Sequence, residues 1–436
     1  MALKRFIDDQ LVAWKNAARR KPLILRGARQ VGKTFSAEAF GREHFGNVVR
    51  VDLERNRDLH RLFAERLAPS DILPQLEVFA KARITPKKTL LFFDEIQSCP
   101  RAIMALRYFY EELPELHVVA AGSLLDFAMS EISFPVGRVQ FLEMCPMTFA
   151  EYLWAAGKEM LAEIVLSAPK KVNETAHRLL LDELRTFLFV GGMPECVAAF
   201  VRSQSLQDSF AVQQQLADSY RQDFSKYAPR ADVHCLDAVF KGVAQSIGQQ
   251  VQYTHLAESY YHKTIKRAFD LLCMARVIQK VPSANPSGLP LGATASARRF
   301  KALMIDVGVW QNVCGLKTDV EYAKDDLLDI YRGAMAEQFV GQETRAAQGP
   351  DLYYWSREAR GSSAEVDYLA VVDKTIHPVE VKSGASGRLR SLHLLLQTYP
   401  NCGEGLVFSM APYAELPEQK VKFLPLYFAY AATRDR

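Results

Sequence analysis

The chain has 436 residues, 49% of them hydrophobic and 24% charged, with a net charge of +4. Its length allows several domains, and its small net charge excludes a generally basic nucleic-acid binder, so such a surface would have to be a local patch. The seven cysteines include no Cys-x-x-Cys pair, which argues against a zinc site and favours reduced thiols. A charged amino terminus and short apolar runs predict no signal peptide, no membrane span and a cytoplasmic location.

Residues 1 to about 150 are predicted to alternate strands with amphipathic helices. After a basic N-terminal helix, strands are expected at residues 22–26, 48–53, 89–93, 117–121 and 138–142. Strands that alternate with helices are typical of a doubly wound α/β domain with a parallel sheet.

A P-loop motif lies between the first of these strands and the helix expected after it. The glycines let the backbone wrap an anion, and the loop N–H groups and the helix N-terminus face the phosphates. Lys33 is expected to reach the β- and γ-phosphates and Thr34 to ligate Mg²⁺. The alternative is a structural glycine-rich turn. The motif, which predicts a site for ATP and Mg²⁺, is Gly27-Ala28-Arg29-Gln30-Val31-Gly32-Lys33-Thr34.

A second motif is the apolar strand 89–93, which ends in Asp94 and Glu95. So apolar a run is typical of a strand buried on both faces, and ligands bind at the carboxyl ends of such strands. Asp94 suits Mg²⁺, and Glu95 suits a base that orients the attacking water. Alone, the pair could be a helix-capping turn. Together with the P-loop it predicts an ATPase that hydrolyses as well as binds.

Residues 150–230 have helical periodicity, with a break at Gly191–Pro194 that should end one helix and begin the next. Residues 233–282 are predicted to form three helices and a strand, with Thr254 as a helix N-cap. This order is that of a winged helix, with Lys263, Lys266 and Arg267 on the recognition helix. Equally, these charges could be the solvated face of an amphipathic helix. Residues 283–290 are the best linker signal.

The C-terminal part contains a predicted hairpin, with strands 366–372 and 375–381 joined at residues 373 and 374. That loop places Asp367 opposite Glu380 and Glu365 opposite Lys382, all on one face. A metal-dependent nuclease needs such a set, with carboxylates for Mg²⁺ and a lysine for the nucleophile. Glu337 is a further candidate ligand. The alternative is a Glu365–Lys382 ion pair on an ordinary hairpin.

These motifs, in this order, resemble a family of bacterial and archaeal AAA+-type ATPases. That family carries a C-terminal domain of unknown function that is similar to restriction-endonuclease (PD-(D/E)xK) cores. The resemblance runs nearly end to end, with Met193 replacing a usual aromatic residue. The segments that carry it are 26–34, 93–97, 121–125, 137–138, 146–153, 191–195, 301–308 and 380–382.

The resemblance implies roles for further residues. Ser123 would be the polar residue that senses the γ-phosphate, where the alternative is a turn serine. Arg138 would be an arginine finger supplied to the nucleotide of a neighbouring subunit, where the alternative is a surface arginine. Residues 191–194 would line the adenine side of the site.

The sequence therefore predicts an α/β chain with three parts. These are an AAA+ P-loop NTPase domain with a helical lid over 1–205, a helical or winged-helix module over 206–285, and a restriction-endonuclease-like domain over 286–436. The expected function is ATP binding and hydrolysis, acting on DNA, in a possible homo-oligomer. The alternative is a nucleotide-controlled switch whose C-terminal domain is an inactive protein-docking module.

Overall fold

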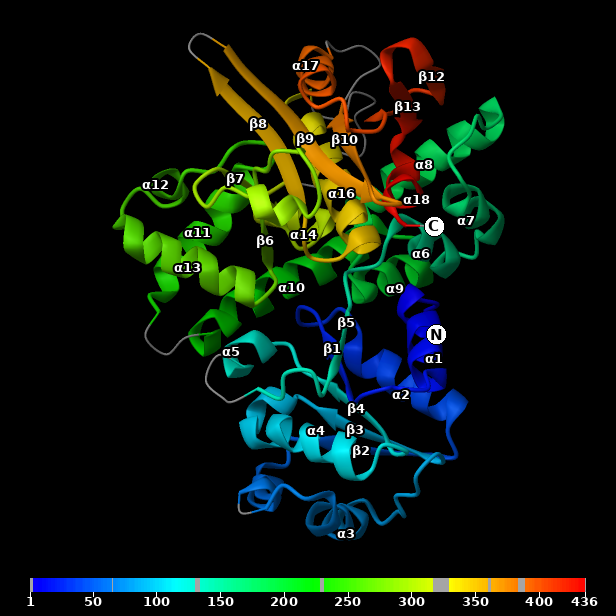
Figure 1. Cartoon of the computed structure of the whole chain (residues 1–436), viewed down its shortest axis with the longest axis vertical. Helices are drawn as coiled ribbons and strands as arrows, with labels where there is room; N and C mark the ends of the chain where they lie inside the picture. Colours follow the sequence, from blue (N-terminus) through cyan, green and yellow to red (C-terminus); the bar gives the residue numbers. More distant parts are fainter. Residues whose placement is uncertain are drawn as a thin grey trace. The chain divides into compact units, whose positions relative to one another are not determined.

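The computed structural model describes residues 3–64, 66–129, 134–227, 231–316, 329–359, 362–382 and 389–435. The chain divides into two compact units, residues 1–145 and 146–436. Figure 1 shows both units, with labels on most of their helices and strands. The predicted boundary at residue 205 does not coincide with this division, because residues 146–205 lie in the second unit. The three-part division stays a prediction.

The first unit is built on a parallel sheet in the order β2-β3-β4-β1-β5. This confirms the α/β expectation, and the strands begin and end within two residues of their predicted limits. The strands are β1 (Leu23–Arg26), β2 (Asn47–Asp52), β3 (Thr89–Asp94), β4 (His117–Ala121) and β5 (Gln140–Glu143). The helices are α1 (Phe6–Asn16), α2 (Lys33–His44), η1 (Arg57–Phe63), α3 (Pro69–Ala80), η2 (Ile96–Ser98), α4 (Pro100–Glu112) and α5 (Leu125–Met129).

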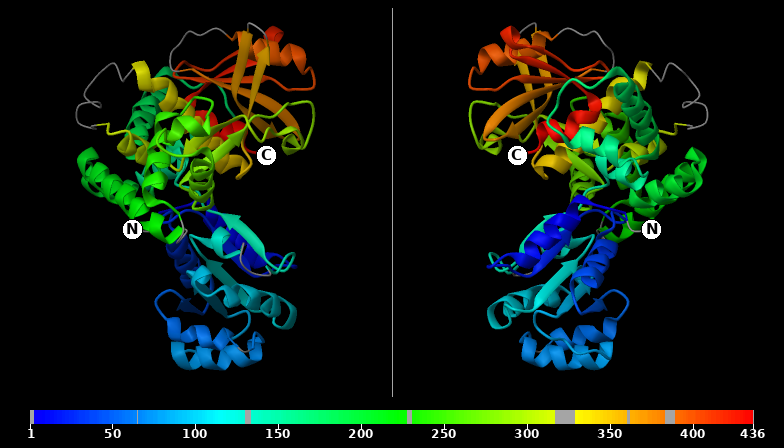
Figure 2. Two further views of the ribbon diagram at one scale, coloured as in Figure 1. Left: turned by 90° about the vertical axis from the view of Figure 1, so that its left-hand side faces the viewer. Right: turned by 90° about the vertical axis from the view of Figure 1, so that its right-hand side faces the viewer.

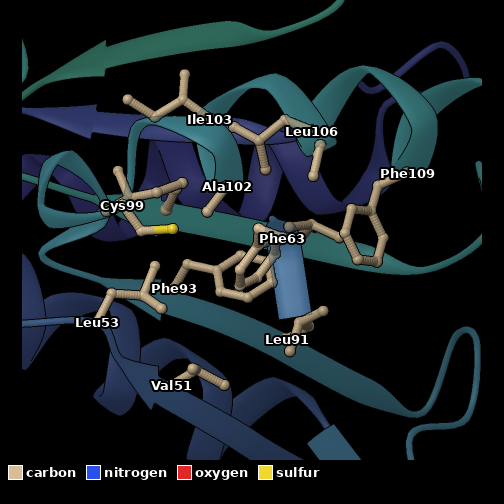
Figure 3. Packing of buried hydrophobic residues seen from close by; sticks show 14 of the residues in the cluster. Val51, Leu53, Phe63, Leu91, Phe93, Cys99, Ala102, Ile103, Leu106 and Phe109 are labelled. Atoms are coloured by element: carbon tan, nitrogen blue, oxygen red, sulfur yellow. The ribbon is translucent and has the colours of Figure 1, made fainter. Parts of the chain in front are cut away.

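Every residue of β3 is buried, as its apolar sequence predicted. On one face of the sheet, Phe93 meets Phe63 and Phe109 edge-on, at ring-centroid distances of 5.9 and 6.0 Å. Figure 3 shows these rings packed with aliphatic side chains of α4 and the strands. Edge-on aromatic pairs add about 0.5–1.5 kcal/mol to the stabilisation from burial. This core fixes the end of β3, where Asp94 and Glu95 stand.

The second unit begins with helices. These are α6 (Phe149–Ala155), α7 (Glu159–Leu166), α8 (Glu174–Val190), α9 (Pro194–Ser203) and α10 (Leu206–Tyr227). The predicted break at residues 191–194 separates α8 from α9. A Cβ on Gly191 would lie 2.4 Å from Asp306 Oδ1, and one on Gly192 would lie 2.1 Å from Met147 O. Both positions therefore require glycine, because these neighbouring atoms leave no room for a side chain.

Three helices and a two-stranded antiparallel sheet follow: α11 (Val233–Gln245), α12 (Tyr253–Leu256), α13 (His262–Met274), β6 (Ile278–Pro282) and β7 (Phe300–Met304). The predicted order of elements is present. Thr254, however, is not an N-cap. The short helix α12 begins one residue earlier, and Gln252 is its cap residue.

The last part of the chain forms a mixed sheet in the order β12-β13-β11-β10-β9-β8. Figure 2 shows these strands from the side, coloured orange to red. The predicted hairpin register is confirmed from Thr375↔Val372 to Val379↔Tyr368. The strands are β8 (Tyr353–Ala359), β9 (Ser362–Val372), β10 (Thr375–Val381), β11 (Gly405–Ser409), β12 (Ala414–Leu416) and β13 (Val421–Pro425).

Helices of this last part complete the second unit. They are η3 (Leu291–Thr294), α14 (Val307–Val313), α16 (Asp329–Gln348), α17 (Arg390–Thr398), η4 (Pro417–Gln419), η5 (Leu426–Phe428) and α18 (Ala429–Thr433). Across the described stretches of the chain, none of the helices is both long and apolar enough to cross a membrane.

Candidate active site

The P-loop joins β1 to α2 in the first unit. Gly27 and Gly32 adopt positive φ angles of 150° and 99°, and α2 begins at Lys33. A Cβ on Gly27 would lie 2.4 Å from Met144 O, so only glycine fits there. The buried Lys33 ammonium donates to Gly27 O at 2.9 Å and to Ala28 O at 2.6 Å. The Lys33 side chain thus folds back onto carbonyl groups of its own loop. The loop lies at the N-terminus of a helix, where anions are stabilised.

Arg5 fixes this loop to the rest of the first unit. Its guanidinium donates to Val31 O at 3.1 Å and to Cys145 O at 2.8 Å. The side chain is buried, just before α1, and the sequence analysis did not single it out. Charge-assisted bonds of this kind are about twice as strong as neutral ones, so Arg5 should hold the loop in place.

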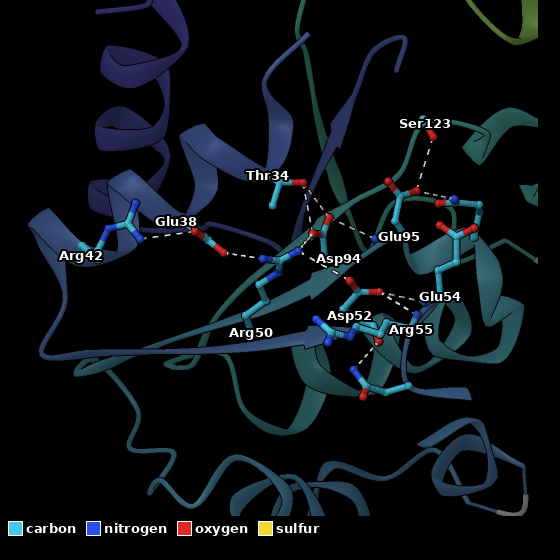
Figure 4. Close-up of polar contacts among 12 residues, drawn as sticks. Thr34, Glu38, Arg42, Arg50, Asp52, Glu54, Arg55, Asp94, Glu95 and Ser123 are labelled. Atoms are coloured by element: carbon cyan, nitrogen blue, oxygen red, sulfur yellow. Dashed lines mark hydrogen bonds and ion pairs between the residues drawn. The ribbon is translucent and has the colours of Figure 1, made fainter. Parts of the chain in front are cut away.

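Asp94 lies beside Thr34, although the two residues are 60 positions apart. The Thr34 hydroxyl is 3.1 Å from both carboxylate oxygens of Asp94 (Figure 4). Asp94 is buried at the end of β3, and burial raises the pKa of its carboxyl. The Thr34 hydroxyl and the Asp94 carboxylate are the oxygen donors that Mg²⁺ prefers. These two predicted ligands therefore stand together.

Glu95 and Ser123 also meet at this edge of the sheet. The Gln97 amide donates to Glu95 Oε2 at 2.6 Å, and the Ser123 hydroxyl lies 3.4 Å from the same oxygen. Arg29 of the P-loop donates to Ser123 Oγ at 3.4 Å. Strand β4 lies between β1 and β3, which is why Ser123, after β4, reaches both motifs. Glu95 itself has a positive φ of 48°.

A residue that sequence reasoning missed is Arg50 of β2. Its guanidinium donates to Asp94 Oδ2 and to Glu38 Oε1, each at 2.7 Å (Figure 4). Arg50 is 40% exposed, whereas the Asp94 side chain is 3% exposed. Its attraction opposes the effect of burial on the Asp94 pKa. A single charge within the apolar strand Val48-Val49-Arg50-Val51 was the available signal.

Arg138, the predicted arginine finger, precedes β5 in the same unit. Its Nε donates to Glu111 Oε1 at 2.8 Å, and Arg107 donates to the same oxygen at 3.0 Å. Arg138 is 45% exposed and Glu111 is 32% exposed. The two arginines lower the pKa of Glu111, Arg138 most strongly. Ion pairs that are exposed to water in this way contribute little to stability, so this one can be broken easily.

The predicted nuclease residues gather in the second unit, around a lysine that was not predicted as a site residue. Lys301 of β7 is 2% exposed. Its ammonium lies 2.8 Å from Glu337, 2.5 Å from Glu365 and 3.2 Å from Asp367. Burial alone would lower the pKa of Lys301, but these three carboxylates raise it well above its usual range. The lysine is therefore a charged ammonium.

The remaining predicted residues complete this cluster. Lys382 donates to Glu380 Oε1, so it pairs with its near neighbour on the strand and not with Glu365. Asp367 Oδ2 accepts the Val381 N–H at 2.8 Å. Burial, and then Asp367, raise the pKa of Glu337 to about 8 and that of Glu380 to about 7. The four carboxylates outnumber the two ammonium groups, those of Lys301 and Lys382, so the cluster favours retention of a proton.

Within the described stretches of the chain, no group of three or more His, Cys, Asp or Glu side chains is placed to hold a metal ion. For the C-terminal residues the arrangement explains this result, because Asp367 uses both of its oxygens on protein donors. The predicted roles of Asp367, Glu380, Glu337 and Lys382 therefore stay predictions.

The basic helix α13 exposes Lys263, Lys266 and Arg267 on one side. The other side is buried through Ile265, Ala268, Phe269 and Leu272. Helix α13 is thus strongly amphipathic, with its charges in solvent, as both interpretations of the sequence require.

Comparisons with known proteins support the interpretation of the N-terminal unit. Residues 19–153 match the family described as AAA domain, which identifies an AAA-type P-loop domain. Residues 181–320 match a domain of unknown function (DUF8612), and residues 332–428 match another (DUF4143). The last match does not establish a nuclease core. A comparison with curated proteins gives no match.

Solved structures similar to this chain include the Walker-type ATPase PABY2304 of Pyrococcus abyssi, at 15% identity and a TM-score of 0.45, covering 72% of this chain and 96% of that one. The RuvB Holliday junction branch migration motor of Thermotoga maritima is 16% identical, with a TM-score of 0.31, covering 63% and 89%. The ORC1 protein of Aeropyrum pernix in complex with DNA is 12% identical, with a TM-score of 0.28, covering 70% and 89%. Similarities this distant carry no argument about function.

Proposed function

We propose that the protein is an ATP hydrolase whose catalytic groups are those of the first unit. The observation that carries the proposal is the convergence of Lys33, Asp94 and Glu95 at the carboxyl ends of parallel strands. The P-loop residues Gly27–Thr34 would cradle the phosphates with backbone N–H groups, and Lys33 would move from the loop carbonyls to the β- and γ-phosphates.

Thr34 and Asp94 would hold Mg²⁺, since their oxygens already face each other at 3.1 Å. By holding Mg²⁺ there, Thr34 and Asp94 would supply positive charge that offsets the charge developing during transfer. The cation now paired with Asp94 is Arg50, which is partly exposed and can leave. Arg50 would then be free to approach the phosphates or solvent.

Glu95 would orient the attacking water and accept its proton. In the structure its carboxylate is held by Gln97 and lies near Ser123, so Ser123 would link the base to the γ-phosphate region. Arg138 would act on the nucleotide of a neighbouring subunit after leaving Glu111, which requires a homo-oligomer.

The direct test is steady-state hydrolysis of ATP with Mg²⁺ by the full chain. Glu95→Gln should lower kcat about 10²–10⁴-fold, because an amide cannot take the proton of the water. Affinity for ATP should be unchanged. Glu112→Gln, an exposed acid on α4, is the matched control and should hydrolyse like the wild type. Equal turnover in Glu95→Gln and the wild type would exclude this assignment.

We further propose that the protein acts on DNA through α13. The three-helix segment followed by antiparallel β6 and β7 supports a winged-helix arrangement, in which a basic helix enters a groove. Lys263, Lys266 and Arg267 would neutralise DNA phosphates. Each phosphate that is no longer neutralised should flatten the salt dependence of duplex binding by about 0.9 in the log–log slope.

Replacing these three residues with Glu tests the DNA proposal. The matched control is the triple change of Lys170, Lys171 and Arg178, which are exposed elsewhere on the second unit. Binding to labelled duplex, measured from 50 to 200 mM salt, should weaken and flatten only for the α13 variant. An unchanged slope would place any DNA contact elsewhere.

The second candidate function is a nucleotide-controlled switch whose C-terminal domain docks a protein. Lys301 favours this candidate, because it fills the carboxylate cluster that a nuclease would need for metal. ATP hydrolysis with and without duplex, branched and single-stranded DNA discriminates the two. Stimulation that falls steeply with salt supports action on DNA, since phosphate contacts release counterions.

A further inference from the structure

Lys301 brings a positive charge to the centre of the nuclease-like carboxylates. It comes from β7, while Glu337 comes from α16 and both Glu365 and Asp367 come from β9. Glu337 and Asp367 are two of the three residues predicted to bind a divalent ion, the third being Glu380. Both already give an oxygen to the ammonium, at 2.8 and 3.2 Å.

We propose that Lys301 permanently occupies the cation position of this cluster, so that the C-terminal sheet keeps its nuclease-like carboxylates together without a divalent metal and does not cut DNA by a metal-dependent route. The proposal goes beyond ATP hydrolysis and does not depend on it.

Burial explains why the ammonium is permanent. The Lys301 side chain is 2% exposed, and its strand is paired with β6 at Val281. A divalent ion would have to displace a charge that is itself buried, and would leave that ammonium without its partners.

The other cluster residues are also committed to protein contacts. Asp367 Oδ2 accepts the Val381 N–H, and Glu380 Oε1 accepts from Lys382. A Cβ on Gly248 would lie 3.1 Å from Glu337 Oε2, so the chain after α11 closes that side. Burial, and then the nearby Asp367, raise the pKa of the Glu380 carboxyl above its usual value.

The same contacts give the cluster a structural role. Because β7 follows the helical segment α11–α13, the Lys301 ion pairs fasten that segment to α16 and to the C-terminal sheet. The cation supplied by one part of the second unit thus neutralises carboxylates supplied by another.

The test is a titration of the nucleotide-free full chain with MnCl₂ in an Asp94→Asn background, which removes the ion ligand beside the P-loop. The Asp94→Asn protein, which is the parent of the variants below, should bind no stoichiometric Mn²⁺. Lys301→Ala should melt about 10 °C lower in metal-free buffer, because its carboxylates lose their cation. It should also bind one Mn²⁺ and recover part of the loss.

Lys280→Ala is the matched control, since Lys280 lies on β6 and contacts the Ala297 carbonyl and the Phe300 ring. It should gain no Mn²⁺ site. If Lys301→Ala does not fold, the parent titration decides. Binding of one Mn²⁺ by the parent that Asp367→Asn abolishes, or a folded Lys301→Ala that binds none, overturns the proposal.

Discussion

The nucleotide site and the C-terminal carboxylate cluster both pair a buried acid with a basic side chain from a strand. In the first unit Arg50 pairs with Asp94, and in the second unit Lys301 pairs with three carboxylates. The basic residues differ in exposure, at 40% for Arg50 and 2% for Lys301. An exposed cation can leave its carboxylate when Mg²⁺ binds there. A buried cation stays and occupies the position that a metal ion would need.

Clusters of acidic residues can therefore have opposite chemistry. Sequence patterns suggested a metal for the carboxylates of both sites. What differs is whether the charge that neutralises the acids can leave for water, because a buried charge without a partner is far more costly than a solvated one.

The largest effect is expected at Arg138. If it acts on a neighbouring subunit, Arg138→Ala should lower turnover about 10³-fold or more, because transition-state charge loses its cation. Mixing Arg138→Ala with Lys33→Ala subunits should restore some activity that neither has alone, measured as ATP hydrolysis against mixing ratio. A monomeric protein with full activity would rule this role out.

Lys33→Ala should weaken ATP binding about 100-fold, because the phosphates lose a charge-assisted partner. Isothermal titration with ATP and Mg²⁺ measures this change. Lys88→Ala, an exposed lysine just before β3, serves as the control and should bind ATP normally. Retained affinity in Lys33→Ala would argue that the loop is only a turn.

The buried acids of the second unit should make its stability depend on pH. Burial raises the pKa of Glu343 to about 8, and its carboxylate accepts the Phe149 N–H at 3.0 Å. The folded state holds this proton more tightly than the unfolded chain does. The free energy of unfolding should therefore fall as pH rises from about 4.5 to about 8, by at most about 1.4 kcal/mol per pH unit for one group.

Glu343→Gln keeps an acceptor for Phe149 but cannot titrate, so its stability should fall less across this window. Urea denaturation at pH 5, 6, 7 and 8 measures the difference. Glu163→Gln, an exposed acid on α7, should retain the wild-type slope. An identical slope in Glu343→Gln would show that this carboxyl does not hold its proton.

The smallest effect is expected at Arg50. Arg50→Gln removes the cation that competes for Asp94, so the Mn²⁺ concentration that half-saturates the nucleotide-bound protein should fall about three- to tenfold. Arg42→Gln is the matched control, because Arg42 donates to the same Glu38 from one turn further along α2. A weaker Mn²⁺ affinity in Arg50→Gln would mean that Arg50 helps to bind the nucleotide.

Local pattern predicted the strands of the first unit, the break at residues 191–194 and the hairpin register, because each depends on neighbouring residues. It failed at Thr254, because the helix begins two residues earlier than predicted and Gln252 is its cap residue. Lys301 and Arg50 were missed as site residues because their partners lie 36 to 66 and 12 to 44 positions away along the chain. Only the fold brings such charges together. The one signal in the sequence was that each of these two residues is a lone charge among apolar residues.

The most direct test of ATP hydrolysis is a single turnover with radiolabelled ATP and Mg²⁺, with protein in excess. The wild type should convert bound ATP to ADP, while Glu95→Gln should retain it as ATP, because only the base is lost. Lys33→Ala should retain little nucleotide of either kind. Bound ATP that stays intact on the wild type, or ADP formed equally fast by Glu95→Gln, would contradict the assignment of Glu95 as the base of an ATPase.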